Sequence, residues 1–283
     1  MAKIETKDLQ IGNLTWAYRE LVPDNPREKP PVVMLHGLVS QGYSWRDVMP
    51  ALAEQGFRSL APDWIGHGSS SKPHKREFAY NQAAYLTALD DYLKALEIDR
   101  FSLVVQGFLG VPGLLYAAQN PDRIERLIIL NTPLPPKASL PLPIKMMGWP
   151  AVGDMMTQDP LLVDRTLEGG GPYQVADEDL DVYRRPFLKT SAVGRALMWT
   201  IRAMKMSQIT EQIAQGFVDW SRPTLVAWGT SDPWLSADDA KTFATSLADG
   251  EYVALDEVGH YAQEDWAEKV SEAIVPFLRK QEV

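Results

Sequence analysis

Residues 101–110, F-S-L-V-V-Q-G-F-L-G, carry the pattern that best indicates the fold class of this chain. The first six of these residues form a largely apolar, β-branched run, which predicts a strand that is buried on both faces of a sheet. Gly107 follows this run directly. The fold class depends on how often such runs recur, and the functional interpretation depends on the glycine.

Comparable runs alternate with helical patterns along the chain. This alternation predicts an α/β protein with a mostly parallel, doubly wound sheet. Residues 9–19 differ, because an Ile-Gly-Asn-Leu turn joins two extended runs and predicts an antiparallel hairpin at the sheet edge. Further buried strands are predicted at residues 31–35, 58–61, 127–130 and 224–227. Helical spacing is found at Leu86, Leu89, Leu93 and Leu96, and again at Trp266, Val270, Ile274 and Phe277.

Residues 133–217 interrupt this pattern. Prolines are dense at the start of the segment, a Gly-Gly-Gly-Pro break follows at residues 169–172, and two helical stretches are predicted at residues 177–183 and 192–206. We therefore predict a helical cap at residues 133–217, inserted into a core of residues 1–132 and 218–283. Seven of the ten methionines lie in the cap. They either fill gaps between cap and core or form an adaptable apolar lining for a small hydrophobic molecule or a protein partner.

Composition excludes several classes of function. The 283 residues carry a net charge of −9, so no basic field is available to hold a nucleic acid. The absence of cysteine excludes disulfides, thiolate catalysis and cysteine metal sites. The acidic residues 177–181 lack the glycine and terminal glutamate of a calcium loop, so no metal and no cofactor are expected. No charge-free run is long enough to span a bilayer, and we expect a cytoplasmic protein.

Candidate functional residues follow the predicted strands. In an open parallel sheet, ligands bind at the carboxyl ends of the strands. His36, Gly37 and Leu38 follow the first buried strand, and Asp232 follows the strand that ends near residue 228. His260 comes later still. An acid at a late strand end, followed by a histidine, is the chain order of a hydrolase acid and base.

These segments resemble the α/β-hydrolase superfamily, and within it the haloalkane dehalogenase and epoxide hydrolase branch, over essentially the whole chain. The resemblance implies about eight strands flanked by helices. It also implies that His260 is the catalytic base, that Asp232 orients it, and that the backbone N–H groups of Leu38 and Phe108 form an oxyanion hole. We expect the pocket around them to include His36, Trp45, Gln106 and Tyr173, although His36 also suits a loop-stabilising role.

The nucleophile of this family is expected in a G-x-Nuc-x-G turn after residues 101–105, and there the sequence places Gly107. Glycine offers no hydroxyl, thiol or carboxylate, so a covalent intermediate cannot form at this position. Val105 and Leu109 also replace the usual small flanking residues. Phe108 and Leu38 stand where dehalogenases carry a halide-binding tryptophan and its polar counterpart. A relocated nucleophile would have to be one of Ser40, Ser44, Ser102 and Thr132.

A finer resemblance is to a nucleophile-lacking subgroup of cyanobacteria and plastids. The resemblance rests on Val105-Gln106-Gly107 at the turn and on two motifs of the cap. These are Gly170-Gly171-Pro172-Tyr173 and Tyr183-Arg184-Arg185-Pro186. This resemblance implies the cytosol or the plastid stroma.

Two functional hypotheses remain open from the sequence. In the first, His260 acts as a general base in a non-covalent hydrolase or lyase with a small hydrophobic substrate, and the space left by the nucleophile admits water or a substrate oxygen. In the second, the protein is catalytically inactive and binds a ligand or a protein partner. The His260–Asp232 pair is expected to be hydrogen-bonded in both.

Overall fold

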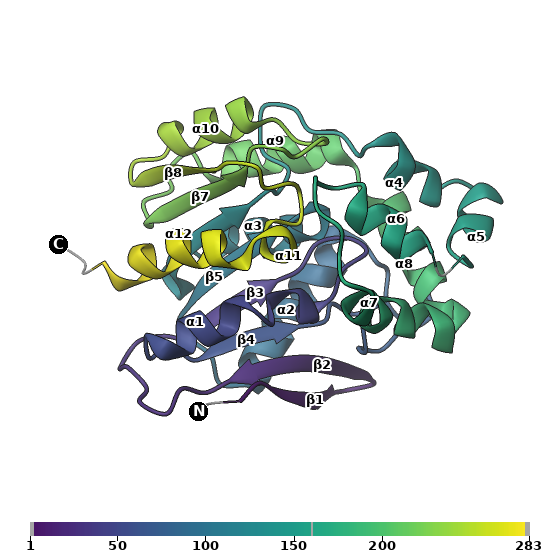
Figure 1. The fold of residues 1–283 in the computed structure, drawn as a ribbon, viewed down its shortest axis with the longest axis horizontal. Coiled ribbons are helices and arrows are strands. Elements are labelled where there is room, and N and C mark those ends of the chain that lie inside the picture. Colours follow the sequence, from purple (N-terminus) through teal and green to yellow (C-terminus); the bar gives the residue numbers. More distant parts are fainter. Residues whose placement is uncertain (1–2, 160, 281–283) are drawn as a thin grey trace.

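The computed structural model describes residues 3–159 and 161–280 (Figure 1). Its centre is an eight-stranded sheet in the order β1-β2-β4-β3-β5-β6-β7-β8. The first two strands form an antiparallel edge hairpin, and β3 to β8 run parallel to one another. This confirms the predicted α/β class. The strands are β1 (Glu5–Ile11), β2 (Leu14–Leu21), β3 (Val32–Leu35), β4 (Ser59–Pro62), β5 (Phe101–Gln106), β6 (Ile124–Leu130), β7 (Thr224–Gly229) and β8 (Gly250–Leu255).

Helices cover both faces of the sheet, because the central strands are apolar on both sides. In β3, Val33 and Leu35 join one apolar cluster, whereas Val32 and Met34 join the other. The first cluster packs under α2, α3, α9 and α10, and the second packs under α1 and α12. The bounds of these helices are α1 (Val48–Glu54), α2 (Gln82–Ala95), α3 (Val111–Gln119), α9 (Met206–Gly216), α10 (Ala237–Ser246) and α12 (Ala267–Arg279).

Residues 133–217 are helical, and no strand occurs in the part of this segment that the structure describes. Five helices lie together beyond the ends of the central strands (Figure 1). The sixth helix of the segment, α9, packs instead against α3 of the sheet layer. The division into core and cap stays a prediction. The five helices are α4 (Leu142–Met147), α5 (Val152–Met156), α6 (Leu162–Glu168), α7 (Asp177–Lys189) and α8 (Ser191–Ala203).

The methionines of this segment lie in different surroundings. Met147 is buried in the apolar cluster, as a gap-filling residue would be, and Met198 is buried beside the guanidinium of Arg202. Met155 is 71% exposed. Met204 and Met206 are buried but line a surface groove described below.

The strand register brings the predicted functional residues to one edge of the sheet. Leu35 pairs with Val105, and Gln106 pairs with Leu130, so β3, β5 and β6 end side by side. The loops that start at residues 36, 107 and 131 therefore meet there. Across the described residues, no helix is both long and apolar enough to cross a membrane.

Candidate active site

The turn at Gly107 has a backbone conformation that favours glycine. Gly107 has φ 70° and ψ −170°, and the short 3-10 helix η2 (Phe108–Gly110) follows it. This part of conformational space is essentially restricted to glycine, and a residue with a Cβ is strained there by about 1–3 kcal/mol. The turn then leads directly into α3, with the N–H of Gly110 donating to the carbonyl of Gly107 at 3.0 Å.

The space beside Gly107 is filled by the loop after β3. A Cβ built on Gly107 would lie 2.9 Å from the Cα of Gly37 and 3.3 Å from Nε2 of His260. A Cβ on Gly37 would in turn lie 3.0 Å from the Cα of Gly107. The two glycine backbones therefore pack against each other, and a side chain at position 107 would require the Gly37 backbone to shift.

Gln106 joins three segments behind this contact. Its Nε2 donates to the carbonyl of His260 at 2.8 Å, and its Oε1 accepts the N–H of Gly37 at 3.1 Å. The side chain is fully buried. It therefore fixes the histidine loop and the Gly37 loop relative to the end of β5. A buried amide with both ends hydrogen-bonded is a favourable arrangement, whereas losing one partner would leave an unpaired polar group.

His260 and Asp232 form the expected pair. Nδ1 of His260 lies 2.8 Å from Oδ2 of Asp232, and both side chains are almost fully buried. The carboxylate also accepts hydrogen bonds from the N–H groups of Trp234 and Leu235 at 2.8 and 3.2 Å. Because these oxygens act as acceptors, Nδ1 carries the proton, and in the neutral imidazole the lone pair is on Nε2.

Asn131 is a member of the site that the sequence analysis did not assign. Its Nδ2 donates to Oδ2 of Asp232 at 2.9 Å, and its Oδ1 accepts the N–H of Gly229 at 2.8 Å. It thereby connects the end of β6 to the end of β7 and holds the carboxylate toward His260. The sequence gives one signal for it, because an Asn directly after a buried strand lies at the functional edge of the sheet.

The imidazole of His260 is enclosed. Its ring stacks on Phe108 at a centroid distance of 5.1 Å and contacts Trp234 at 4.8 Å and Tyr261 at 5.0 Å. The backbone N–H of His260 donates to the carbonyl of Gly170, in the segment between α6 and α7, at 2.6 Å. His260 is 1% exposed, and it does not line the two largest described cavities, of about 580 and 490 Å³.

Asp265 is a half-buried carboxyl near the pair. Its Oδ2 accepts the N–H of Gly259 at 2.7 Å. Burial, together with the negative charge of Asp232, raises the pKa of Asp265 to about 6, and the Gly259 hydrogen bond opposes this shift only in part. A Cβ on Gly171 would lie 2.5 Å from the same oxygen, so the 169–171 segment packs tightly here.

The remaining predicted pocket residues lie in different places. Burial lowers the pKa of His36 to about 4, its Nδ1 donates to the carbonyl of Gly37, and its Nε2 accepts the N–H of Trp64, which is a loop-stabilising arrangement. Leu38 is buried beside the site and its carbonyl accepts the Tyr261 hydroxyl at 3.0 Å. Trp45 belongs to the apolar cluster under α1 and α12. Tyr173 packs against Trp266 at a centroid distance of 5.9 Å.

The four hydroxyl groups considered as relocated nucleophiles form no hydrogen bond to His260 within residues 3–159 and 161–280. Ser44 accepts from Gln263 at 3.2 Å, and Thr132 donates to the carbonyl of Leu130 at 3.0 Å. Ser102 is near the start of β5, at the opposite end from Gly107. Ser40 lines a small internal cavity beside His67.

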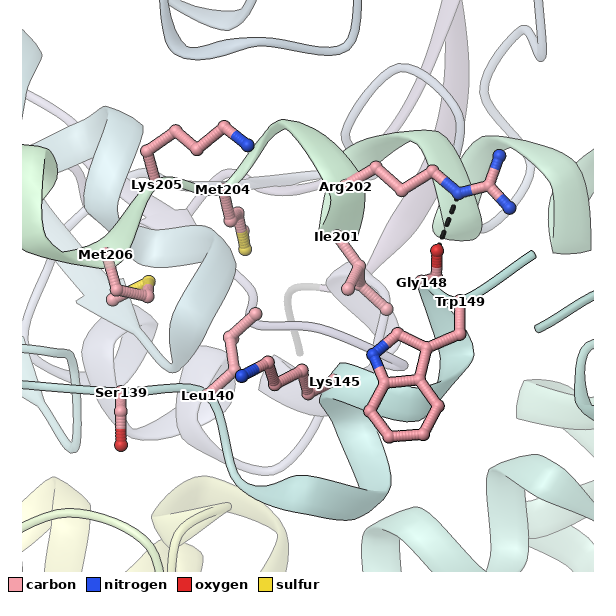
Figure 2. A pocket seen from close by; sticks show the side chains of 10 residues that line it. All are labelled: Ser139, Leu140, Lys145, Gly148, Trp149, Ile201, Arg202, Met204, Lys205 and Met206. Carbon is pink, nitrogen blue, oxygen red and sulfur yellow. Dashed lines mark hydrogen bonds between the residues drawn. The ribbon is translucent and has the colours of Figure 1, made fainter. Parts of the chain in front are cut away.

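An open groove lies elsewhere, between α4 and the end of α8 (Figure 2). It has a volume of about 360 Å³. In Figure 2, Ile201 and Met204 point toward Leu140, and Trp149 closes one side. The guanidinium of Arg202 donates to the carbonyl of Gly148 at 2.6 Å and braces the wall. The full lining is Ser139, Leu140, Lys145, Gly148, Trp149, Ile201, Arg202, Met204, Lys205 and Met206.

Residues 30–266 match the family model described as the alpha/beta hydrolase fold, and the chain belongs to this family. It is similar to a haloalkane dehalogenase of Psychrobacter cryohalolentis, with 27% identity over 90% of this chain and 85% of that protein. It is also similar to a cis-3-alkyl-4-alkyloxetan-2-one decarboxylase of Xanthomonas campestris pv. campestris, with 28% identity over 91% of each chain.

Solved structures share the fold. A loop variant of the haloalkane dehalogenase DbeA from Bradyrhizobium elkanii has a TM-score of 0.84 and 24% identity, covering 97% of this chain and 96% of that one. The epoxide hydrolase CorEH has a TM-score of 0.78 and 23% identity, covering 97% and 98%. The predicted superfamily and its dehalogenase-like relatives are thus confirmed.

We predict that Gly107→Ala destabilises the protein by about 2–5 kcal/mol, because backbone strain adds to the overlap with Gly37. Urea denaturation measures the loss. Gly12→Ala is the matched control, since Gly12 also has a positive φ of 57° but a Cβ there would meet nothing within 4 Å. It should cost only about 1–2 kcal/mol. Equal losses in the two variants would contradict the proposed close packing at the turn.

We also predict that Asp265 makes stability depend on pH. Because its folded pKa is about 6, above the ordinary value of 3.8, its protonated form stabilises the fold at low pH, and this contribution is lost as pH rises from about 4 to 6. Asp265→Asn should therefore raise the free energy of unfolding by about 1–2 kcal/mol at pH 7.5 and hardly change it at pH 4. Asp256→Asn, at an exposed aspartate, is the control. If Asp265→Asn raised the free energy of unfolding equally at both pH values, the raised pKa of Asp265 would be refuted.

Proposed function

We propose that this protein binds a small hydrophobic molecule and carries out no covalent catalysis. The observation that carries the proposal is the turn at Gly107, where a backbone conformation suited to glycine coincides with a Gly37 Cα 2.9 Å from the position of a Cβ. Gly107 offers no nucleophilic side chain, and the Gly37 backbone lies where a side chain at this position would begin. The His260–Asp232 pair then serves to hold the loops at the sheet edge together.

The groove between α4 and α8 supports the binding part of the proposal. Its floor is apolar, with Leu140, Ile201 and Met204, whereas Lys145 and Lys205 contribute positive charge at its margin. This combination suits a hydrophobic molecule with a carboxylate group, because the tail is removed from water while the acid meets a cation. Met204 and Met206 can adapt to tails of different shapes.

A second candidate is the non-covalent hydrolase or lyase, and one observation favours it. Nε2 of His260 lies 3.3 Å from where a Cβ of residue 107 would be, while Asp232 holds the opposite side of the ring. The imidazole is therefore oriented to take a proton from a molecule placed beside Gly107. Such a molecule requires the Gly37 and Gly107 loops to separate. The similarity to a decarboxylase makes a lactone a reasonable substrate class to test.

A screen with esters, epoxides, haloalkanes and oxetan-2-one lactones separates the two candidates. We expect the wild-type protein to give no turnover above that of His260→Ala. The reason is that Phe108, Trp234 and Tyr261 enclose the imidazole and that Gly107 offers no nucleophile. Turnover of any of these substrates that His260→Ala abolishes would overturn the first candidate and support the second.

Binding in the groove is tested with dodecanoate as the probe, by isothermal titration calorimetry. We expect Leu140→Glu to weaken binding at least ten-fold, because it places a carboxylate on the apolar floor. Leu142→Glu is the matched control, since Leu142 is 60% exposed and does not line the groove. The assignment fails if the wild-type protein does not bind dodecanoate, or if both variants bind it equally well.

A further inference from the structure

A second open pocket lies on another side of the molecule, where the edge hairpin, the loops after β3 and β4, and the second half of α7 meet. Its volume is about 580 Å³, which is larger than that of the apolar groove. It is well within the range of sites that hold small organic molecules. His260 and Gly107 are not among its lining residues, so it is separate from the candidate active site.

The charge of this pocket is opposite to that of the whole protein. Five of its lining residues are cationic and none is acidic, although the chain carries a net charge of −9. The cations come from four separate segments of the chain. Because like charges repel, gathering them around one space is unfavourable unless something compensates them. The five are Arg19, Arg46, Lys72, Arg185 and Lys189.

Two of these cations are already paired behind the pocket wall. Arg19 contacts the buried carboxylate of Asp63 at 2.9 Å. Arg46 contacts Asp179 of α7 and Glu264, each at 2.8 Å. These pairs fix the two arginines in place and leave the other three cations to determine the net charge of the pocket.

The remaining three cations have no carboxylate partner within the described residues. Lys72 donates to the carbonyl oxygens of Gly68 and Ser70, both at 2.6 Å, which holds the amine but does not neutralise it. The pKa of Lys72 is lowered to about 8. Burial is the main cause, the charge of Lys189 contributes, and Asp63 opposes the shift. Arg185 and Lys189 lie four residues apart on α7, so both side chains extend from one face of that helix.

We propose that this pocket binds a small phosphorylated molecule, with its phosphate held between Lys72 and the α7 pair Arg185 and Lys189. A phosphate carries up to two charges and several acceptor oxygens, which suits a lysine on one side and a guanidinium on the other. The volume exceeds the need of the phosphate alone, and the ring of Tyr43 and the side chain of Thr190 also line the pocket and are available to an organic part.

A bound phosphate would also connect two parts of the fold. Lys72 belongs to the loop after β4, whereas Arg185 and Lys189 belong to α7. The direct contacts between α7 and the sheet loops include the Arg46–Asp179 pair and the hydrogen bond from Gln41 to the carbonyl of Val182 at 3.0 Å. The ligand would add a further bridge and hold α7 more firmly against the loops.

The test uses the full chain with three probes: inorganic phosphate, pyrophosphate and ribose 5-phosphate. Calorimetry at 0.15 M NaCl measures the Kd, and hydrogen exchange locates the ligand. We expect ribose 5-phosphate to bind more tightly than inorganic phosphate and to slow exchange in α7 and in residues 68–72. The variant Arg185→Glu/Lys189→Glu should lose at least ten-fold in affinity, since two attractive charges become repulsive.

The control variant is Lys241→Glu/Arg279→Glu, which changes net charge by the same amount on α10 and α12, away from the pocket. It should keep the wild-type affinity. Equal losses in the two double variants would mean that only overall charge matters, and would overturn the proposal. So would the absence of binding by all three probes, or protection confined to other elements. Equal affinity for phosphate and ribose 5-phosphate would refute the proposed contacts with an organic group, and the pocket would then be a site for free phosphate.

Discussion

The contact between the backbones of Gly37 and Gly107 is the constraint on which the functional edge of the sheet depends. Neither residue has a Cβ, so the two loops approach closely, and Gly107 adopts a conformation that other residues avoid. This approach puts the Gln106 amide within reach of the Gly37 N–H and the His260 carbonyl at once. The position of the loop that carries His260 therefore follows from the close approach of the two glycines and from the buried amide of Gln106.

The contacts at the same edge hold the His260–Asp232 pair in place without any need for a catalytic role. Asp232 accepts hydrogen bonds from His260, Asn131 and two backbone N–H groups, so its buried charge is well compensated. Removing His260 would take away one of these donors and leave a cavity among Phe108, Trp234 and Tyr261. The pair thus has a structural role that does not depend on catalysis.

The sequence predicted those parts of the structure that leave a local pattern. β3, β5 and β6 are buried on both faces and read as continuous apolar runs, whereas β8 is partly exposed at the sheet edge and was not identified. Gly107 could be placed because it follows such a run. The bonds made by Gln106 and Asn131, and the raised pKa of Asp265, arise only when distant segments meet. The cationic pocket was missed for the same reason, since its residues come from separate segments that are individually unremarkable.

The open spaces of the molecule bear on where this fold can hold a ligand. In an open parallel sheet the carboxyl edge is the usual binding region. Here a pocket along α7 adjoins the loops after β3 and β4 at that edge, and a groove runs along α8; neither is lined by His260 or Gly107. Both spaces are bounded by helices of the 133–217 segment, and both carry cations. Because α7 and α8 pack against each other, the two spaces lie against adjoining helices of one packed unit.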